Sequence, residues 1–387
     1  MSEAAPLVSE PTLEEEERKT SYLELFFDLV FVFAFTQVTS LILEDTSPAG
    51  FARSALVLGM VWWAWSAYAW MTNAIDVENA VTRLILFAAM AAGFFMALAV
   101  PDAFQDEAAW FAVAYFVVRV LQSTLFAWGV RNDPGNLRAT FLLARWFVPA
   151  AVVALIGGFV DSDYRVWFWL ASLAIDVVGT LTVARAEWRV SPSHFAERFA
   201  LIVIIALGES IVAIGIGTSG LERNTTYAFS VVVTFAGVAA LWWTYFDLTA
   251  VGLERALRRA PPEKRGPLAR DTFTFFHYPV VLGIIFYAVA AKKTLEHPLD
   301  PLPEAGRWAL GLGIATFLVG LALTRWRMID RIAWERVAGA ALALAVAVVL
   351  DGVDAIVVVG VVVAITAACV FFETARLHEF RAEMRAR

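Results

Sequence analysis

The chain of 387 residues contains a single cysteine, Cys369, and only four histidines. One cysteine excludes an internal disulfide and a CxxC metal or redox site. HExxH, GxSxG and P-loop patterns do not occur either, so a zinc protease or an ATP-driven pump is not expected. From these motifs we predict no catalytic residue, no metal site and no cofactor.

Charge is also scarce, because only 17% of the residues are charged while 60% are hydrophobic. Soluble proteins contain about 25% charged and about 45–50% apolar residues, so this composition indicates a membrane protein. The net charge of −7 gives no reason to expect nucleic-acid binding. The expected partners are membrane lipids and a small solute or ion, and the sequence does not indicate an oligomeric state.

Long apolar runs follow one another along the chain. A spanning helix needs about 20 mostly apolar residues, and turn signals and charges divide the sequence into segments of that length. The sequence therefore predicts an all-α, polytopic membrane protein with twelve transmembrane helices. Their approximate ranges are 22–43, 51–72, 81–100, 108–130, 139–159, 165–184, 195–217, 227–249, 272–291, 307–325, 331–350 and 352–373.

The basic residues lie mostly on one side of this topology. Residues 1–20 are acidic and lack the basic start and apolar core of a signal peptide. With the N-terminus inside, 23 of the 30 Lys and Arg residues fall on the cytoplasmic side, six fall outside, and Arg119 lies within a span. This asymmetry predicts that both termini are cytoplasmic. The predicted location is therefore the plasma membrane of the cell.

A pair of similar blocks suggests an internal repeat. "ELFFDLVFVFAFTQ" (24–37) opens the first half of the chain, and "ERFALIVIIALGES" (197–210) opens the second, 173 residues later. A tryptophan pair follows each block, Trp62–Trp63 and then Trp242–Trp243, 180 residues apart. Two parallel six-helix repeats explain this spacing, since each half crosses the membrane an even number of times.

The predicted division of the chain follows from that repeat and from the charged ends. It consists of an acidic tail (1–21), a first six-helix half (22–184), a second six-helix half (185–373) and a basic tail (374–387).

The first block carries two carboxylates near its cytoplasmic end. Glu24 and Asp28 are four residues apart and therefore lie on one face of a helix. Gln37, nine residues further on, points to the opposite side. At 1.5 Å per residue, Asp28 lies about 9 Å from the start of the span. We expect these carboxylates to face protein or water rather than lipid.

Four more ionisable groups are expected inside the membrane. Arg119 and Asp176 both fall near mid-membrane, where a charge costs about 2.5–3.5 kcal/mol. They therefore either form a structural salt bridge or belong to a functional site. Glu209 is placed toward the outside, and His277, before Pro279, toward the cytoplasm. Together with Asp28 and Glu24 they form a predicted ladder of ionisable groups, as ion or proton pathways use.

The tryptophan pairs have two interpretations. Trp62 and Trp63 fall in the middle of a span, away from the interfaces where aromatic belts lie. They either pack between helices or form an aromatic wall of a solute cavity. Asp247 is close to the end of its helix, where an interfacial position is the alternative. The candidate cavity-lining residues are Gln37, Trp62, Trp63, Trp242, Trp243 and Asp247.

Several long blocks together resemble one family. "ELFFDLVFVFAFTQ", "WWAWSAYAWMTNAIDVENAVTRL", "HFAERFALIVIIALGESIVAIG" and "LWWTYFD" occur in order between residue 24 and about residue 287. They resemble the bacterial low temperature requirement protein A (LtrA) family. The resemblance implies a polytopic bacterial membrane protein with a link to growth at low temperature, but no particular substrate or reaction.

The function expected from the residues is secondary transport of a small solute or ion, coupled to protons or another cation. The ion-binding or proton-relay candidates are Glu24, Asp28, Arg119, Asp176, Glu209 and His277. Two other functions stay open at this point: a cation channel of two six-helix repeats, and an intramembrane enzyme acting on a lipid or isoprenoid through the carboxylates. We expect a protein that is not an enzyme.

Overall fold

The computed structural model describes residues 20–75, 77–132, 134–182, 190–219 and 221–376, and this part of the chain is helical almost throughout. Single residues Pro301 and Asp354 form an isolated β-bridge between two loops. The first six helices are α1 (Tyr22–Glu44), α2 (Pro48–Ala74), α3 (Ala80–Leu98), α4 (Ala108–Gly129), α5 (Pro134–Gly157) and α6 (Ser162–Thr182).

The second part of the chain contains both long and short helices. They are α7 (Pro192–Gly217), α8 (Thr225–Thr244), the π-helix η2 (Tyr245–Thr249), α9 (Ala250–Arg259), α10 (Pro262–Ala269), the π-helix η3 (Arg270–Phe275), α11 (His277–Glu296), α12 (Glu304–Ile329), α13 (Trp334–Val349) and α14 (Ala355–Arg376).

Ten helical segments of the described chain are long and apolar enough to cross a membrane. The other two of the twelve expected spans correspond to α2 and α13. Tryptophan and small polar residues lower the hydropathy of α2, and neighbouring helices bury most of it. Helix α13 has only 16 residues. The all-α, polytopic fold class is therefore confirmed.

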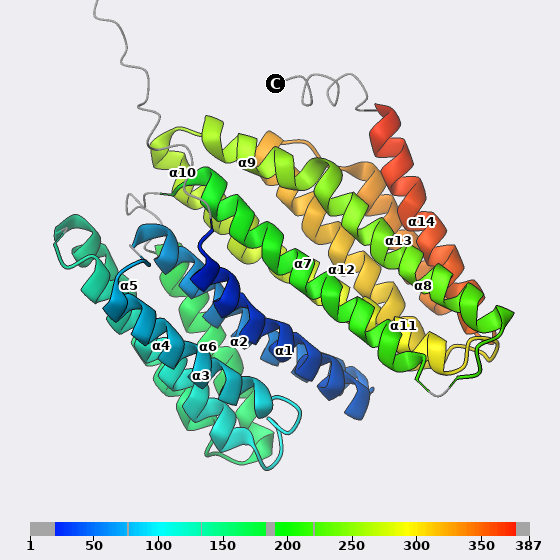
Figure 1. The fold of residues 1–387 in the computed structure, drawn as a ribbon, viewed down its shortest axis with the longest axis horizontal. Helices are drawn as coiled ribbons and strands as arrows, with labels where there is room; N and C mark the ends of the chain where they lie inside the picture. The colour runs from blue at the N-terminus through cyan, green and yellow to red at the C-terminus, as the bar shows by residue number, and fades with distance from the viewer. Residues whose placement is uncertain (1–19, 76, 133, 183–189, 220, 377–387) are drawn as a thin grey trace, which may run out of the picture.

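The long helices run roughly side by side as one elongated bundle (Figure 1). The start of α1 and the end of α14 lie at the same end of the bundle, as do α9 and α10. We call this end the terminal face. Helices α3 to α6 gather on one side of the bundle, and α8 with α11 to α14 on the other, while α1 and α7 lie between them (Figure 1).

The helix neighbours follow the same order in both parts of the chain. In the first part α1 contacts α3, α3 contacts α4, α4 contacts α5, and α6 returns to α2. In the second part α7 contacts α11, α11 contacts α12, α12 contacts α13, and α14 returns to α8. Helices α1 and α2 contact α7 and α11 across the division. This order of neighbours agrees with the predicted sequence repeat. The repeat and its boundaries remain a prediction.

Helix α11 is enclosed by protein along most of its length. It packs against α12 through a pair of glycines, and a Cβ atom on Gly313 would lie 2.9 Å from the carbonyl oxygen of Gly283. Two helices approach this closely only where small residues leave room for the backbone. The α11–α12 contact therefore depends on the absence of side chains at this crossing.

Two π-helical segments interrupt the second part of the chain near the terminal face. Segment η3 ends just before α11, and Phe276 N–H donates to the carbonyl of Asp271, five residues earlier. Pro279 has no N–H group to donate to the carbonyl of Phe275, so the α-helical ladder is already broken here. The expected span at 272–291 therefore becomes η3 followed by α11, which continues to Glu296. π-Helical turns occur often at functional sites.

Candidate functional site

The start of α1 is fixed by a capping box that uses Glu24. The Glu24 N–H donates to Ser21 Oγ at 3.2 Å, and Ser21 N–H donates to Glu24 Oε2 at 2.9 Å. Such a reciprocal pair satisfies two otherwise free donors at a helix start. The same carboxylate faces α7, where His194 Nε2 lies 3.1 Å from both of its oxygens. Glu24 is thus both a cap and a contact between the two parts of the chain.

Asp28 lies one turn further along α1 and meets Arg198 of α7. The Arg198 Nη2 donates to Asp28 Oδ1 at 2.8 Å, and Arg198 Nη1 lies 3.3 Å from Glu24 Oε1. The indole N–H of Trp65 on α2 donates to the same Asp28 oxygen at 2.8 Å. All these side chains are buried. We call Glu24, Asp28, His194 and Arg198 the α1–α7 ion cluster.

Several polar atoms of this cluster have no hydrogen-bond partner in the described chain. Asp28 Oδ2 and Arg198 Nε are buried and unsatisfied by the residues that the structure describes. Burying a charge is costly unless it is paired and hydrogen-bonded. Two carboxylates also share one arginine here, with His194 as the other basic group. The cluster is therefore a charged site with hydrogen-bonding capacity left over.

The sequence predictions included the acidic side of this cluster but missed the basic side. His194 and Arg198 are four residues apart at the start of α7, as Glu24 and Asp28 are at the start of α1. Each helix start carries two ionisable residues four positions apart, acidic on α1 and basic on α7. This spacing was the signal in the sequence that could have predicted the cluster. Arg198 was interpreted only as a marker of the cytoplasmic side.

Arg119 and Asp176 do form a pair, between α4 and α6. Arg119 Nη2 donates to Asp176 Oδ1 at 2.9 Å, and both side chains are buried. The guanidinium also lies over the ring of Phe147, 5.0 Å from its centre. Arg119 Nε and Nη1, Asp176 Oδ2 and Tyr115 Oη have no hydrogen-bond partner among the described residues. This pair is part of a second buried polar group, inside the first six helices.

Glu209 and His277 lie apart from both groups. Glu209 accepts a hydrogen bond from Thr36 of α1, near the end of the bundle opposite the terminal face. His277 Nδ1 lies 2.8 Å from the carbonyl of Thr272, and its Nε2 lies 2.8 Å from Tyr245 Oη. Both nitrogens of His277 are thus used inside the second part of the chain. The predicted ladder is divided into separate buried groups.

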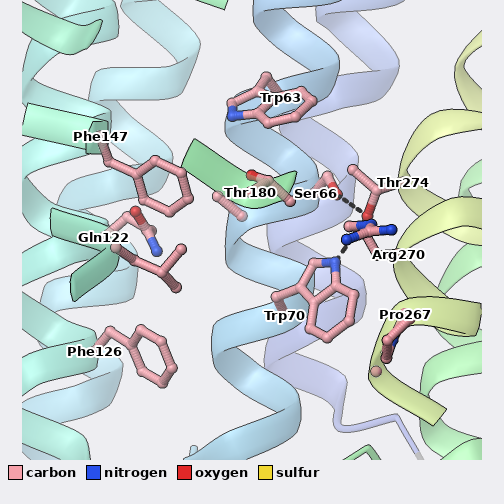
Figure 2. Close-up of a pocket in the computed structure, with 13 residues that line it drawn as sticks. Trp63, Ser66, Trp70, Gln122, Phe126, Phe147, Thr180, Pro267, Arg270 and Thr274 are labelled. Carbon is pink, nitrogen blue, oxygen red and sulfur yellow. Dashed lines mark hydrogen bonds between the residues drawn. The ribbon is translucent and has the colours of Figure 1, made fainter. Parts of the chain in front are cut away.

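A hollow opens between the two parts of the chain (Figure 2), with about 690 Å³ of empty space when the part open to solvent is included. Aromatic side chains from α2, α4 and α5 form much of its wall, and the start of η3 forms the side opposite α4. In Figure 2, Trp63 lies at one end, and Trp70, Phe126 and Pro267 lie toward the other. The lining residues are Trp63, Ser66, Ala67, Trp70, Gln122, Phe126, Leu143, Phe147, Thr180, Gly266, Pro267, Arg270 and Thr274.

Helix α2 separates the hollow from the α1–α7 ion cluster. Trp65 points to Asp28, while Ser66 and Trp70 line the hollow and contact Thr274 of η3. The indole N–H of Trp62 also donates to the Thr274 carbonyl at 2.8 Å. One helix therefore contacts both the charged cluster and the hollow, so a movement of α2 changes both.

The second polar group borders the hollow as well. Gln122 is three residues after Arg119 on α4, and Thr180 is four residues after Asp176 on α6, so each pair shares a helix face. Gln122 and Thr180 line the hollow, and so does Phe147, which stacks on Arg119. The Arg119–Asp176 pair therefore lies about one helical turn from the lining residues, farther from the terminal face.

Only one of the predicted cavity-lining residues, Trp63, lines this hollow. Trp62 is buried against Phe199 and Trp65 instead. Trp242 and Trp243 are about half exposed, at 47% and 53%. Their prediction as cavity residues is corrected, because α8 lies at the outer edge of the bundle against α14. Gln37 and Asp247 are half-buried and lie outside the hollow's lining.

The helices and their buried charges define a multi-pass α-helical membrane protein. The family model for the bacterial low temperature requirement A protein (LtrA) matches residues 19–371. The chain therefore belongs to the LtrA family. It is also similar to an uncharacterized protein of Rhizobium meliloti (strain 1021), with 35% identity over 295 residues, which cover 73% of this chain and 71% of that protein. No solved structure matches the chain.

Proposed function

We propose that this protein is a secondary transporter of a small solute or ion, with transport coupled to protons or another cation. The observation that carries the proposal is the α1–α7 ion cluster. It places four ionisable groups in the contact between the two parts of the chain, beside the hollow. Ionisable residues inside membrane helices usually mark ion, proton or substrate pathways. No chemical reaction is part of this proposal.

The cluster can link charge to movement. Asp28 is held by Arg198 from α7 and by Trp65 from α2, so its charge joins three helices. A proton or cation that neutralises Asp28 weakens both contacts and releases Arg198 from Asp28, which leaves Glu24 as its acidic partner. Transporters commonly work by movement of one helical group against the other around a central site. In this proposal the release of Arg198 permits that movement, and the hollow holds the solute.

The proposal is tested with protein reconstituted in liposomes. Uptake of two labelled probes, rubidium and naphthalenesulfonate, is measured with and without a pH gradient. We expect uptake of one probe above that of protein-free liposomes and faster with the gradient. Asp28→Asn is expected to abolish this dependence, because the neutral amide keeps the size of the side chain but cannot exchange a proton. Asp163→Asn changes an exposed carboxylate at the far end of α6 and serves as the control.

The two variants separate the possible results. An unchanged dependence on the gradient in Asp28→Asn removes the cluster from the coupling mechanism. Equal uptake by protein-containing and protein-free liposomes for both probes contradicts transport of these classes. Gradient-independent rubidium currents of single-channel size support a channel instead.

The proposal also places the terminal face in the cytoplasm, because α9 and α10 carry basic residues there. The test uses the single cysteine, Cys369, replaced in Cys369→Ala, and one new cysteine at a time. Glu263 of α10 and Glu222 before α8 are both exposed, at opposite ends of the bundle. A membrane-impermeant maleimide applied to intact bacterial cells is expected to label Glu222→Cys. We expect it to label Glu263→Cys only after the cells are permeabilised.

The reverse labelling pattern contradicts the proposed orientation. Labelling of both sites in intact cells indicates a leaky membrane, which a cytoplasmic marker protein detects in the same cells.

A further inference from the structure

We propose that the hollow between α2, α4, α5, α6 and η3 binds an amphipathic organic anion, with its apolar body among the aromatic side chains and its anionic head at Arg270. This inference rests on the proposed function and names the class of solute. The lining of the hollow is mostly aromatic and apolar with a few polar side chains, which is the usual composition of a small-molecule site.

The apolar body has a defined place. Trp63 of α2, Phe126 of α4 and Phe147 of α5 form wall positions, and Leu143 of α5 also lines the hollow. Aromatic side chains bury large apolar areas, and another ring or an alkyl chain can pack against their faces or edges. The end near Trp63 is farthest from the terminal face, so the body of the ligand points into the membrane interior.

Arg270, on the wall that η3 forms, is the cation that would bind the anionic head. Arg270 Nε and Nη2 both donate to Asp271 Oδ1, at 2.8 and 2.6 Å, and its Nη1 makes no hydrogen bond within the described chain. The second oxygen of Asp271 accepts from Arg327 Nε at 2.8 Å. Two arginines therefore share one carboxylate, so these three side chains together keep a positive charge.

A hydroxyl pair beside Arg270 adds donor capacity. Ser66 Oγ and Thr274 Oγ1 are 3.2 Å apart, and the Trp70 indole N–H donates to Thr274 Oγ1 at 2.8 Å. One of the two hydroxyl protons makes the bond between the pair, and the other can be donated to a ligand. Figure 2 shows these groups together with Arg270 on one wall. Guanidinium and hydroxyl donors together suit a carboxylate, sulfonate or phosphate oxygen.

This anion can come from water or from the membrane. An aromatic sulfonate or carboxylate arrives from solution, whereas an alkyl phosphate arrives from the lipid layer. The end of the hollow at Pro267 belongs to α10, which lies at the terminal face (Figure 1), so either head group can enter from the interface. The shared chemistry is one anionic head on an apolar body of limited size.

The test measures binding to the full-length protein in lipid nanodiscs. The probes are naphthalenesulfonate and dodecyl phosphate, each compared with a neutral counterpart, naphthalenesulfonamide or dodecanol. We expect saturable binding of at least one anion, and Arg270→Gln is expected to raise its Kd about tenfold or more. Arg270→Lys keeps the charge and is expected to retain more of the affinity. Trp63→Ala is expected to weaken the anion and its neutral counterpart alike.

Lys264→Gln, which removes an exposed cation of α10, is the matched control and is expected to leave the Kd unchanged. Two results overturn the inference: neither anion binds saturably, or Arg270→Gln binds the anion as the wild type does. Binding of one anion but not the other identifies solution or lipid as the source. Binding without uptake in liposomes supports this site and contradicts the transporter proposal, so the two failures are distinguishable.

Discussion

Replacement of Arg198 by leucine is expected to lower the free energy of unfolding by about 3–5 kcal/mol, because removing one partner of a buried ion pair leaves an uncompensated charge. Asp28 loses its arginine partner, and Glu24 keeps only His194 and the cap at Ser21. The measurement is reversible unfolding by SDS in mixed micelles. Far-UV circular dichroism before the titration shows whether the variant starts from a helical state.

A matched variant and a double variant decide how this loss is interpreted. Arg258→Leu removes an exposed arginine that pairs with Glu254 four residues away, and an exposed pair of this kind contributes less than about 1 kcal/mol. The double variant Asp28→Leu/Arg198→Leu is expected to recover much of the stability, since apolar replacements of a buried pair are often neutral. Recovered stability without coupled uptake indicates that the pair serves function. A loss in Arg198→Leu no larger than in Arg258→Leu contradicts the account of the cluster.

The Gly283→Ala substitution is expected to disrupt the contact of α11 with α12. The added Cβ would lie 2.7 Å from the backbone nitrogen of Phe317 and would also meet the carbonyl oxygen of Gly313. Backbone atoms of a packed helix cannot move aside alone, so the helices must separate. Overpacking costs about 1–3 kcal/mol and occasionally more, and a backbone clash places this site at the upper end. The same SDS titration measures the loss.

The chain offers a control with the same chemical change. At Gly208 of α7 a Cβ would meet no atom within 4 Å apart from its own helix. Alanine exceeds glycine in helix propensity by about 1 kcal/mol, so Gly208→Ala is expected to leave stability unchanged or raise it. Equal effects of the two substitutions would show that the α11–α12 contact tolerates a methyl group.

The helices were predictable from the sequence because each long apolar run can satisfy its backbone hydrogen bonds in lipid only as a helix. The exceptions have local causes. The predicted span at 272–291 begins later as a regular α-helix, since the π-helix η3 precedes it and Pro279 lies in its first turn. The tryptophans of α2 lower its hydropathy. Its place in the bundle is therefore evident from its burial by protein and not from hydropathy.

The site was predictable only in part, because an apolar helix does not reveal which of its sides meets protein. The Arg119–Asp176 pair followed from equal depth, and its contact is confirmed. Trp242 and Trp243 were predicted as cavity-lining residues, but α8 exposes them.

Basic residues near helix ends were the other source of error. They serve as topology markers in most membrane proteins, so Arg198 and Arg336 received no further role. The structure buries both, with Arg336 donating to Glu373 of α14 at 2.9 Å. Partners from distant helices decide such roles, and the sequence does not specify which helices become neighbours.

The order of helix neighbours has a consequence for biosynthesis. Helices α1 to α6 contact one another in the first part of the chain, so this group can assemble once α6 has entered the bilayer. Helix α8 instead has α14 as a main neighbour, and α7 has α11. Because helices insert individually before they associate, α8 must remain without its partner until α14 has been translated. A ribosome stalled before α14 would thus leave a completed first group beside an open second one, a natural substrate for membrane quality-control proteases.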